Sequence, residues 1–112
     1  MMYNETLVNR IREALINEKD VVEKKMFQGL SFMVDDKLCI GVRNDEILCR
    51  IDHEQAELEL EKEYCRPMIH GQRIAKGYIF VSEDGYHRNK DFQYYIDLCL
   101  DYNKIVQKAK KK

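Results

Sequence analysis

Three β-rich segments, separated by two very short polar breaks, limit the possible folds of this sequence more than any other part of it. The segments cover residues 26–34, 37–43 and 46–51, and the breaks are Asp35-Asp36 and Asn44-Asp45. Aspartate and asparagine tolerate the positive φ angles that two-residue hairpin turns require. The spacing therefore predicts an antiparallel meander of three strands.

Two-residue turns also determine which side chains share a face of that sheet, because side chains alternate along a strand. With this register, the predicted core face holds Phe27, Ser31, Met33, Leu38, Ile40, Val42, Ile47, Cys49 and Ile51. The opposite face mixes charged and polar residues with four apolar ones: Leu30, Phe32, Cys39 and Leu48. That face is more apolar than a fully solvated face needs to be. Either a second helix covers it or a partner does, and the pattern leaves both alternatives open.

Two segments with helical periodicity lie on either side of the meander, one near each end of the sequence. Apolar residues recur at three- and four-residue steps over residues 5–18 and again over about 90–108. Asn4 or Thr6 can cap the first helix, because their side-chain oxygens accept hydrogen bonds from free backbone N–H groups. The last helix is apolar over such a wide arc that we expect burial on more than one side.

Between the meander and the last helix, the sequence predicts a helix, a bend and a fourth strand. Asp52 is a candidate N-cap for a helix over residues 53–64. Arg66-Pro67 should end that helix, because the residue before proline avoids the α region. Residues 68–77 are expected to form a polar bend and residues 77–81 a strand. The predicted fold class is a two-layer α+β domain with an antiparallel sheet and the element order α-β-β-β-α-β-α.

The composition is typical of one soluble globular domain. The 112 residues suit a single domain over 1–112, with an ordered core over about 5–106 and a lysine-rich C-terminal tail. Those lysines could contact phosphates, or they could complement the dipole of the last helix. The formal charge of −1 does not favour a dedicated nucleic-acid binder. No apolar run approaches the length of a membrane span, and no signal peptide is recognisable, so we expect a cytoplasmic location.

The sequence carries no recognised metal-binding or catalytic motif. GxSxG, HExxH, P-loop and GxGxxG patterns are absent. Four cysteines without CxxC spacing are interpreted as small apolar residues in a reducing compartment: Cys39, Cys49, Cys65 and Cys99. Three histidines far apart in the sequence are interpreted as exposed polar residues: His53, His70 and His87. We therefore expect no metal, no cofactor and no enzymatic activity.

Several segments together resemble the N-terminal domain of the TfoX/Sxy family. The family's opening, in which Met-Phe-Gly-Gly leads into an aromatic strand, a turn and two further strands, is similar to MFQGLSFMVDDKLCIGVRND followed by ILCRID. The family's second block is matched, at the expected distance, by RPM at 66–68 and KGYIFV at 76–81. The resemblance covers roughly residues 5–105. Two departures are that Gln28 replaces the first of the paired glycines and that residues 69–75 keep only Arg73 of the usual segment.

The resemblance implies a secretion-chaperone-like α+β fold. From the founding members it also implies regulation of natural competence genes together with a transcription activator. Those regulators carry a second, C-terminal domain, for which 112 residues leave no room, so we expect a stand-alone domain. The favoured function is a non-enzymatic regulatory module that binds a protein, such as a component of the transcription machinery, or a second copy of itself. Its predicted protein interface is Leu30, Phe32 and Leu48.

Two other function classes stay open, and both would use basic residues. The candidate contacts to a partner or an anion are Arg50, Arg66, Arg73 and Lys76. Together with Lys24, Lys25 and Arg43 they could form an anion-binding patch, or they could form salt bridges to the many glutamates. A nucleic-acid-binding accessory protein would bring basic side chains together on one face. A small-molecule binder or enzyme would need a concave pocket near Arg50, Arg66 or Arg73.

Overall fold

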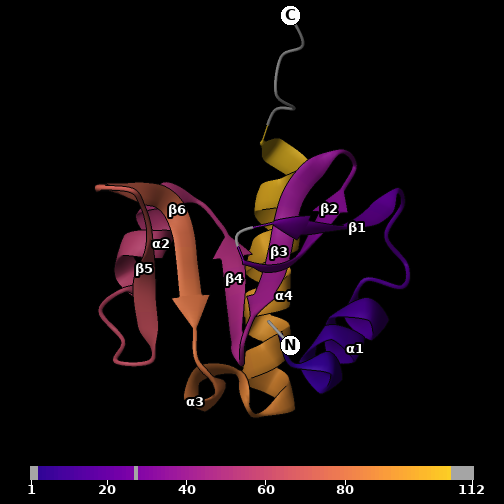
Figure 1. Cartoon of the computed structure of the whole chain (residues 1–112), viewed down its shortest axis with the longest axis horizontal. Helices are drawn as coiled ribbons and strands as arrows, with labels where there is room; N and C mark the ends of the chain where they lie inside the picture. The colour runs from indigo at the N-terminus through magenta and orange to yellow at the C-terminus, as the bar shows by residue number, and fades with distance from the viewer. Residues whose placement is uncertain (1–2, 27, 107–112) are drawn as a thin grey trace, which may run out of the picture.

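A six-stranded antiparallel sheet with helices packed on one side forms the body of the chain (Figure 1). The computed structural model describes residues 3–26 and 28–106. The elements in chain order are α1 (Glu5–Ala14), β1 (Val21–Met26), β2 (Gly29–Val34), β3 (Lys37–Arg43), β4 (Glu46–Arg50), α2 (His53–Glu59), β5 (Cys65–His70), β6 (Arg73–Val81), α3 (Glu83–Tyr86) and α4 (Asn89–Ile105). The predicted two-layer α+β class with an antiparallel sheet is confirmed.

The order of elements is α-β-β-β-β-α-β-β-α-α, which adds two strands and a short helix to the predicted α-β-β-β-α-β-α. The predicted strand over residues 26–34 is interrupted by a turn at Gln28, so β1 and β2 are separate strands. β1 lies at one edge of the sheet, in the order β1-β2-β3-β4-β6-β5. It escaped prediction because its charged middle, Glu23-Lys24-Lys25, is exposed and shows no alternation of apolar and polar residues.

The segment predicted as a polar bend, residues 68–77, instead forms most of a β-hairpin. Ile69 pairs with Ile74 across β5 and β6, and the turn between the strands contains Gly71 with a φ angle of 65°. Pro67 lies inside β5, where it is tolerated because an edge strand needs no hydrogen-bond donor on its outer side. Arg66-Pro67 therefore continues a strand, and α2 ends earlier than predicted, at Glu59.

The two turns of the predicted meander are present. Asp35, Asp36 and Asn44 have φ angles of 52°, 65° and 54°, as two-residue hairpin turns require. β3 and β4 also pair in the predicted register, with Val42 opposite Ile47. The predicted core residues of these two strands and of the following position are buried: Ile40, Val42, Ile47, Cys49 and Ile51. The prediction for Phe27 lies outside the described residues.

A β-bulge at Cys39 exchanges the two faces of β2. Met33 pairs with Leu38, but the next residue back, Phe32, pairs with Ile40, so Cys39 is left without a partner. One extra residue in a strand turns the facing side chains over relative to a regular ladder. The prediction was therefore wrong for three residues, which lie on the face away from the main core: Ser31, Met33 and Leu38. It was also wrong for two residues that lie in the main core: Leu30 and Phe32.

The helices pack against the remaining face and enclose the main core. The core combines this face of the sheet with buried residues from α1 and α4, among them Leu7, Ile11, Phe92 and Ile96. The predicted N-caps are confirmed. Asn4 accepts a hydrogen bond from the backbone N–H of Leu7 at 3.1 Å, and Asp52 accepts from those of Glu54 and Gln55 at 3.1 and 3.2 Å. These caps fix the residues at which α1 and α2 begin.

Candidate functional site

The second face of the sheet carries its own small apolar cluster, made of Leu48, Met68 and Phe80 with Ala75 and Tyr78 packed against it. All three central residues are buried, although no helix of the described chain contributes to the cluster. The sequence left open whether a helix or a partner covers this face. In the structure, cationic side chains of the sheet itself lie over its aromatic rings. We call this surface the open sheet face.

Two guanidinium groups stack on the same aromatic ring there. The guanidinium carbon of Arg43 lies 4.2 Å from the centre of the Phe80 ring, and that of Arg66 lies 4.6 Å from it. Arg66 also forms a two-point ion pair with Glu46, and this bond raises the pKa of the arginine. Such cation–π contacts hold planar charged groups in fixed orientations.

Arg50 extends this arrangement at the end of β4. It pairs across the strands with Tyr78, and its guanidinium carbon lies 5.5 Å from the centre of that ring and 5.9 Å from that of Tyr102 in α4. Within residues 3–26 and 28–106, neither Arg43 nor Arg50 forms a salt bridge. We call this group of residues the arginine–aromatic cluster: Arg43, Arg50, Arg66, Tyr78 and Phe80.

A groove lies between α2 and the β5–β6 hairpin and borders the open sheet face, because Ala75 and Tyr78 line the groove and also pack against the Leu48–Met68–Phe80 cluster. Its volume is about 470 Å³, within the usual range of ligand sites. The walls combine apolar residues of all three elements, namely Ala56, Leu60, Pro67, Ile74 and Ala75. Charged or titratable side chains also line it: His53, Glu54, Glu57 and Lys76. We call this feature the hairpin groove.

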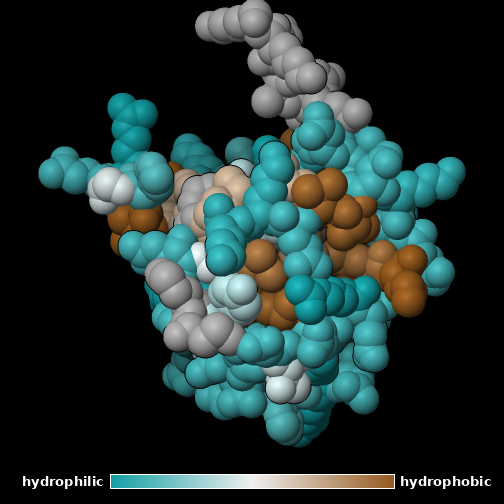
Figure 2. Space-filling view, turned by 45° about the vertical axis from the view of Figure 1, so that its right-hand side comes forward, coloured by the Kyte–Doolittle hydropathy of each residue, from teal (hydrophilic) through white to brown (hydrophobic). Residues whose placement is uncertain are grey.

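The β5–β6 hairpin also exposes apolar side chains directly beside that groove. Ile69 and Ile74 face each other across the two strands and are 64% and 61% exposed. Other large exposed apolar residues of the described chain lie elsewhere, for example Ile16 after α1 and Ile105 at the end of α4. On the side of the molecule seen in Figure 2, apolar residues form separate patches within a mostly hydrophilic surface. A paired patch beside a groove is the stronger candidate for a contact surface.

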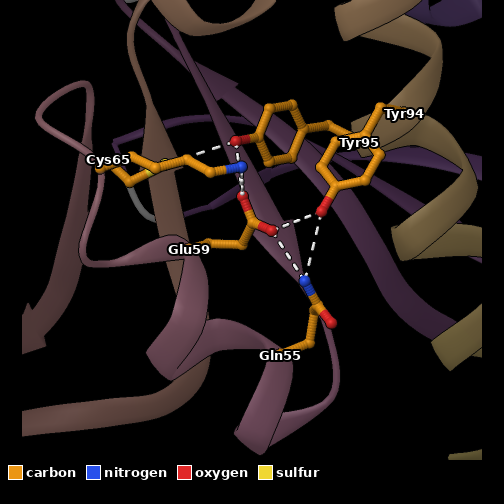
Figure 3. A network of polar contacts seen from close by, with 6 residues as sticks. Gln55, Glu59, Cys65, Tyr94 and Tyr95 are labelled. Carbon is orange, nitrogen blue, oxygen red and sulfur yellow. Dashed lines mark hydrogen bonds and ion pairs between the residues drawn. The ribbon is translucent and has the colours of Figure 1, made fainter.

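A buried carboxylate, Glu59, joins α2 to α4 behind the groove (Figure 3). Its Oε1 accepts hydrogen bonds of 2.7 Å from the Tyr95 hydroxyl and from the Lys62 ammonium group. Its Oε2 accepts from the Tyr94 hydroxyl and, at 2.7 Å, from the Gln55 amide. Burial raises the pKa of Glu59, but these four donors outweigh it and leave the pKa below its ordinary value. All of its partners belong to the chain itself, so we assign Glu59 a structural role.

The family comparison matches residues 13–102 to the TfoX N-terminal domain. The chain belongs to the TfoX N-terminal domain family. The match spans β1 to β6, α3 and nearly all of α4, so it includes both the open sheet face and the hairpin groove. No curated protein and no solved structure shows a significant match to this TfoX N-terminal domain.

The structure gives a physical meaning to the paired glycines of the TfoX N-terminal domain. Gln28, which stands at the first position, has a φ angle of 61°, a conformation that glycine adopts without steric cost. At the second position, a Cβ atom on Gly29 would lie 2.0 Å from the carbonyl oxygen of Val42. The first glycine would relieve a backbone strain, whereas the second makes room for the neighbouring strand.

The predicted contact residues are divided between several places in this TfoX N-terminal domain. Arg50 and Arg66 lie in the arginine–aromatic cluster, together with Arg43. Lys76 lines the hairpin groove, which borders that cluster at Tyr78, and Arg73 lies at the tip of the hairpin next to its turn. The groove and its exposed isoleucines could not be predicted from the sequence, because the polar residues between 68 and 77 indicate a bend.

The predicted protein interface of Leu30, Phe32 and Leu48 is corrected by the structure. All three side chains are buried within the single chain. Leu30 and Phe32 lie in the main core because the bulge at Cys39 turns them toward the helices. Leu48 lies on the open sheet face, where it forms a buried cluster with Met68 and Phe80. None of the three offers the surface that a partner would need.

The remaining sequence interpretations concern cysteines, histidines and membrane spans. All four cysteines are free and buried, in agreement with their reading as apolar core residues. His53, His70 and His87 are exposed, and His53 lines the hairpin groove. In the described part of the chain, no helix is both long and apolar enough to cross a bilayer.

Proposed function

We propose that this TfoX N-terminal domain is a non-enzymatic regulatory module that binds a protein partner at the hairpin groove. The observation that carries the proposal is the exposed pair Ile69 and Ile74 beside the groove. Burying a large aliphatic side chain is worth about 1.5–3 kcal/mol, so two of them next to an apolar groove offer a substantial part of a binding free energy. The pair adds nothing comparable to the fold, because both side chains lie mostly in water.

The charges around the groove indicate what kind of segment would fit. Glu54 and Glu57 lie one helical turn apart on α2, both exposed, and both line the groove. Glu61 and Glu63 follow in the segment after α2. The occupant we propose is a short amphipathic segment of a partner protein, with apolar side chains for the groove and basic ones for this acidic side. Charge complementarity of this kind supports specificity and association rate.

Affinity capture from native cell extract tests the proposal with a matched pair of double variants. Ile69→Glu/Ile74→Glu alters the hairpin, whereas Ile16→Glu/Ile105→Glu adds the same charge at residues that are 76% and 71% exposed elsewhere. We expect the wild-type and control chains to retain the same partner and the hairpin variant to lose it. Mass spectrometry of the retained protein would then reveal whether it belongs to the transcription machinery.

Retention of every captured protein by both double variants would contradict the proposal. Size-exclusion chromatography gives a separate outcome. A dimer that the hairpin variant dissociates would mean that the occupant of the groove is a second copy of this chain.

A further inference from the structure

We infer that the open sheet face is a second binding site, which borders the hairpin groove at Ala75 and Tyr78, and that its ligand is a single-stranded nucleic acid held by its phosphates. One row of directly paired residues, one from each strand, crosses the whole six-stranded sheet. It runs through Lys24, Ser31, Gly41, Leu48, Phe80 and Arg66. Residues directly opposite one another in antiparallel strands share a face. The row therefore begins and ends with a cation, on the face that the helices leave uncovered.

The cations of this face outnumber its carboxylates. Lys24 and Arg66 end the row, and Arg43 lies over Phe80 beside the Arg66 end. Arg50 lies over Tyr78 one row further along, at the border of the face where it also contacts Tyr102 of α4. The carboxylate that forms a salt bridge with one of these four cations is Glu46, which pairs with Arg66. Arg43 and Arg50 thus have charged N–H groups held in place by aromatic rings and no carboxylate of the described chain to neutralise them. Planar guanidinium groups presented in this way suit phosphate oxygens.

The overall charge of −1 does not oppose this inference, because acidic residues are concentrated in the other layer. The helices α1, α2, α3 and α4 together carry ten acidic and four basic residues. The shortest dimension of the molecule is 27 Å, whereas charges are screened beyond about 8 Å at physiological ionic strength. A ligand on the open sheet face therefore experiences chiefly the local cations. The formal charge of the whole chain conceals this separation.

The extent and the chemistry of the face favour a nucleic acid over an acidic peptide. At about 4.8 Å between strands, the row from Lys24 to Arg66 is about 24 Å long, which suits an extended polyanion with a charge on every unit. The half-buried guanidinium planes of Arg43 and Arg50 and the half-buried ring of Tyr78 also offer stacking surfaces for bases. An acidic peptide has no aromatic groups that need such surfaces. The duplex is disfavoured because its bases are already stacked.

Fluorescence anisotropy with a labelled oligothymidine of about 15 nucleotides tests the inference. We expect binding by the full chain at low salt. With four phosphate contacts and a slope of about −0.7 per contact, the association constant should fall about fifty-fold between 50 and 200 mM salt. Arg43→Glu/Arg50→Glu should weaken binding at least tenfold. Arg88→Glu/Lys90→Glu, which makes the same charge change at the exposed start of α4, should leave it unchanged.

Three results would overturn the inference: no binding at 50 mM salt, equal loss in both double variants, or tighter binding of a labelled polyglutamate or of a DNA duplex. Circular dichroism should confirm that the variants are folded. If the charge reversals unfold the chain, Arg43→Gln/Arg50→Gln replaces them, because glutamine keeps much of the side-chain packing without the charge. Unchanged affinity in that folded variant would equally contradict the inference.

Discussion

Among single residues, Glu59 has the least expected environment, because it is buried although glutamate side chains are usually exposed to water. Its apolar neighbour Leu58 is 59% exposed, whereas Glu59 is 1% exposed. The reason is the phase of the helix, since Ala56 and Glu59 are the α2 residues that face inward. A glutamate can be buried there only because four donors satisfy its oxygens. Two of these donors, Tyr94 and Tyr95, lie in α4, so no local pattern around residue 59 reveals them.

Replacing Glu59 by glutamine should make stability less dependent on acid pH. The pKa of Glu59 is below its ordinary value of 4.5, so its contribution is complete above pH 4.5 and is lost as the pH falls through the lower, folded-state pKa. At pH 7, Glu59→Gln should lower the free energy of unfolding by about 2 kcal/mol, and the difference from wild type should shrink in acid. Urea unfolding at several pH values measures both effects.

The control is Glu57→Gln, which makes the same change at an exposed position of the same helix. It should alter the free energy of unfolding by less than about 0.5 kcal/mol at every pH. A Glu59→Gln destabilisation that stays constant into acid would contradict the assignment of the network.

Gln28 is a second residue whose conformation can be tested directly. A non-glycine residue in the left-handed region costs about 1 kcal/mol or slightly more. Gln28→Gly should therefore raise the free energy of unfolding by about 1 kcal/mol, measured by urea unfolding. Gln28→Ala keeps the Cβ atom and should give no such gain. Equal stabilisation by both substitutions would show that the side chain, and not the φ angle of 61°, is the cause.

At the scale of elements, the meander shows how far sequence reasoning reaches. Its two turns and the β3–β4 register follow from Asp35-Asp36 and Asn44-Asp45, because turn chemistry is local. The faces of β2 could not be predicted, since nothing in the residues around Cys39 distinguishes a bulge from a regular ladder. The same limit applies to the β5–β6 hairpin, where a proline and several polar residues hide an edge strand.

The bulge itself can be tested by deletion. Removing Cys39 should leave a regular ladder in which Met33 still pairs with Leu38 and Phe32 with Ile40, so Phe32 keeps its place in the main core. We therefore expect the deletion to cost about as much free energy of unfolding as Cys39→Ala, about 1–2 kcal/mol, because both changes remove the buried Cys39 side chain. Thermal unfolding of both variants compares them. A deletion that costs more than about 3 kcal/mol beyond Cys39→Ala would contradict the bulge, because Cys39 would then be a paired residue of the ladder.

The two edge strands narrow the ways in which a partner can bind. β1 carries Lys24 and Lys25 at its exposed middle, and β5 contains Pro67. Charged side chains and proline at an edge hinder the addition of another strand. Partners should therefore use a groove or a face of the sheet, which is where the exposed isoleucines and the arginine–aromatic cluster lie.

For the whole molecule, the sequence was sufficient for the family, the α+β class and the location of the meander. It was insufficient for the candidate sites, because each depends on pairing between distant segments. Arg43, Arg50 and Arg66 come together only through the order β3-β4-β6-β5. The groove needs α2 to lie beside a hairpin that the sequence does not reveal. Local patterns predict elements, whereas sites arise from their arrangement.

The uneven placement of charge has a practical consequence for handling the protein. With a pI of about 6.3, the chain would ordinarily be loaded only on an anion-exchange resin at neutral pH. A molecule whose opposite sides differ in sign can turn either side toward a charged matrix. Retention on a cation exchanger would then reflect the orientation of the adsorbed protein, and its elution should not be mistaken for a contaminating basic species.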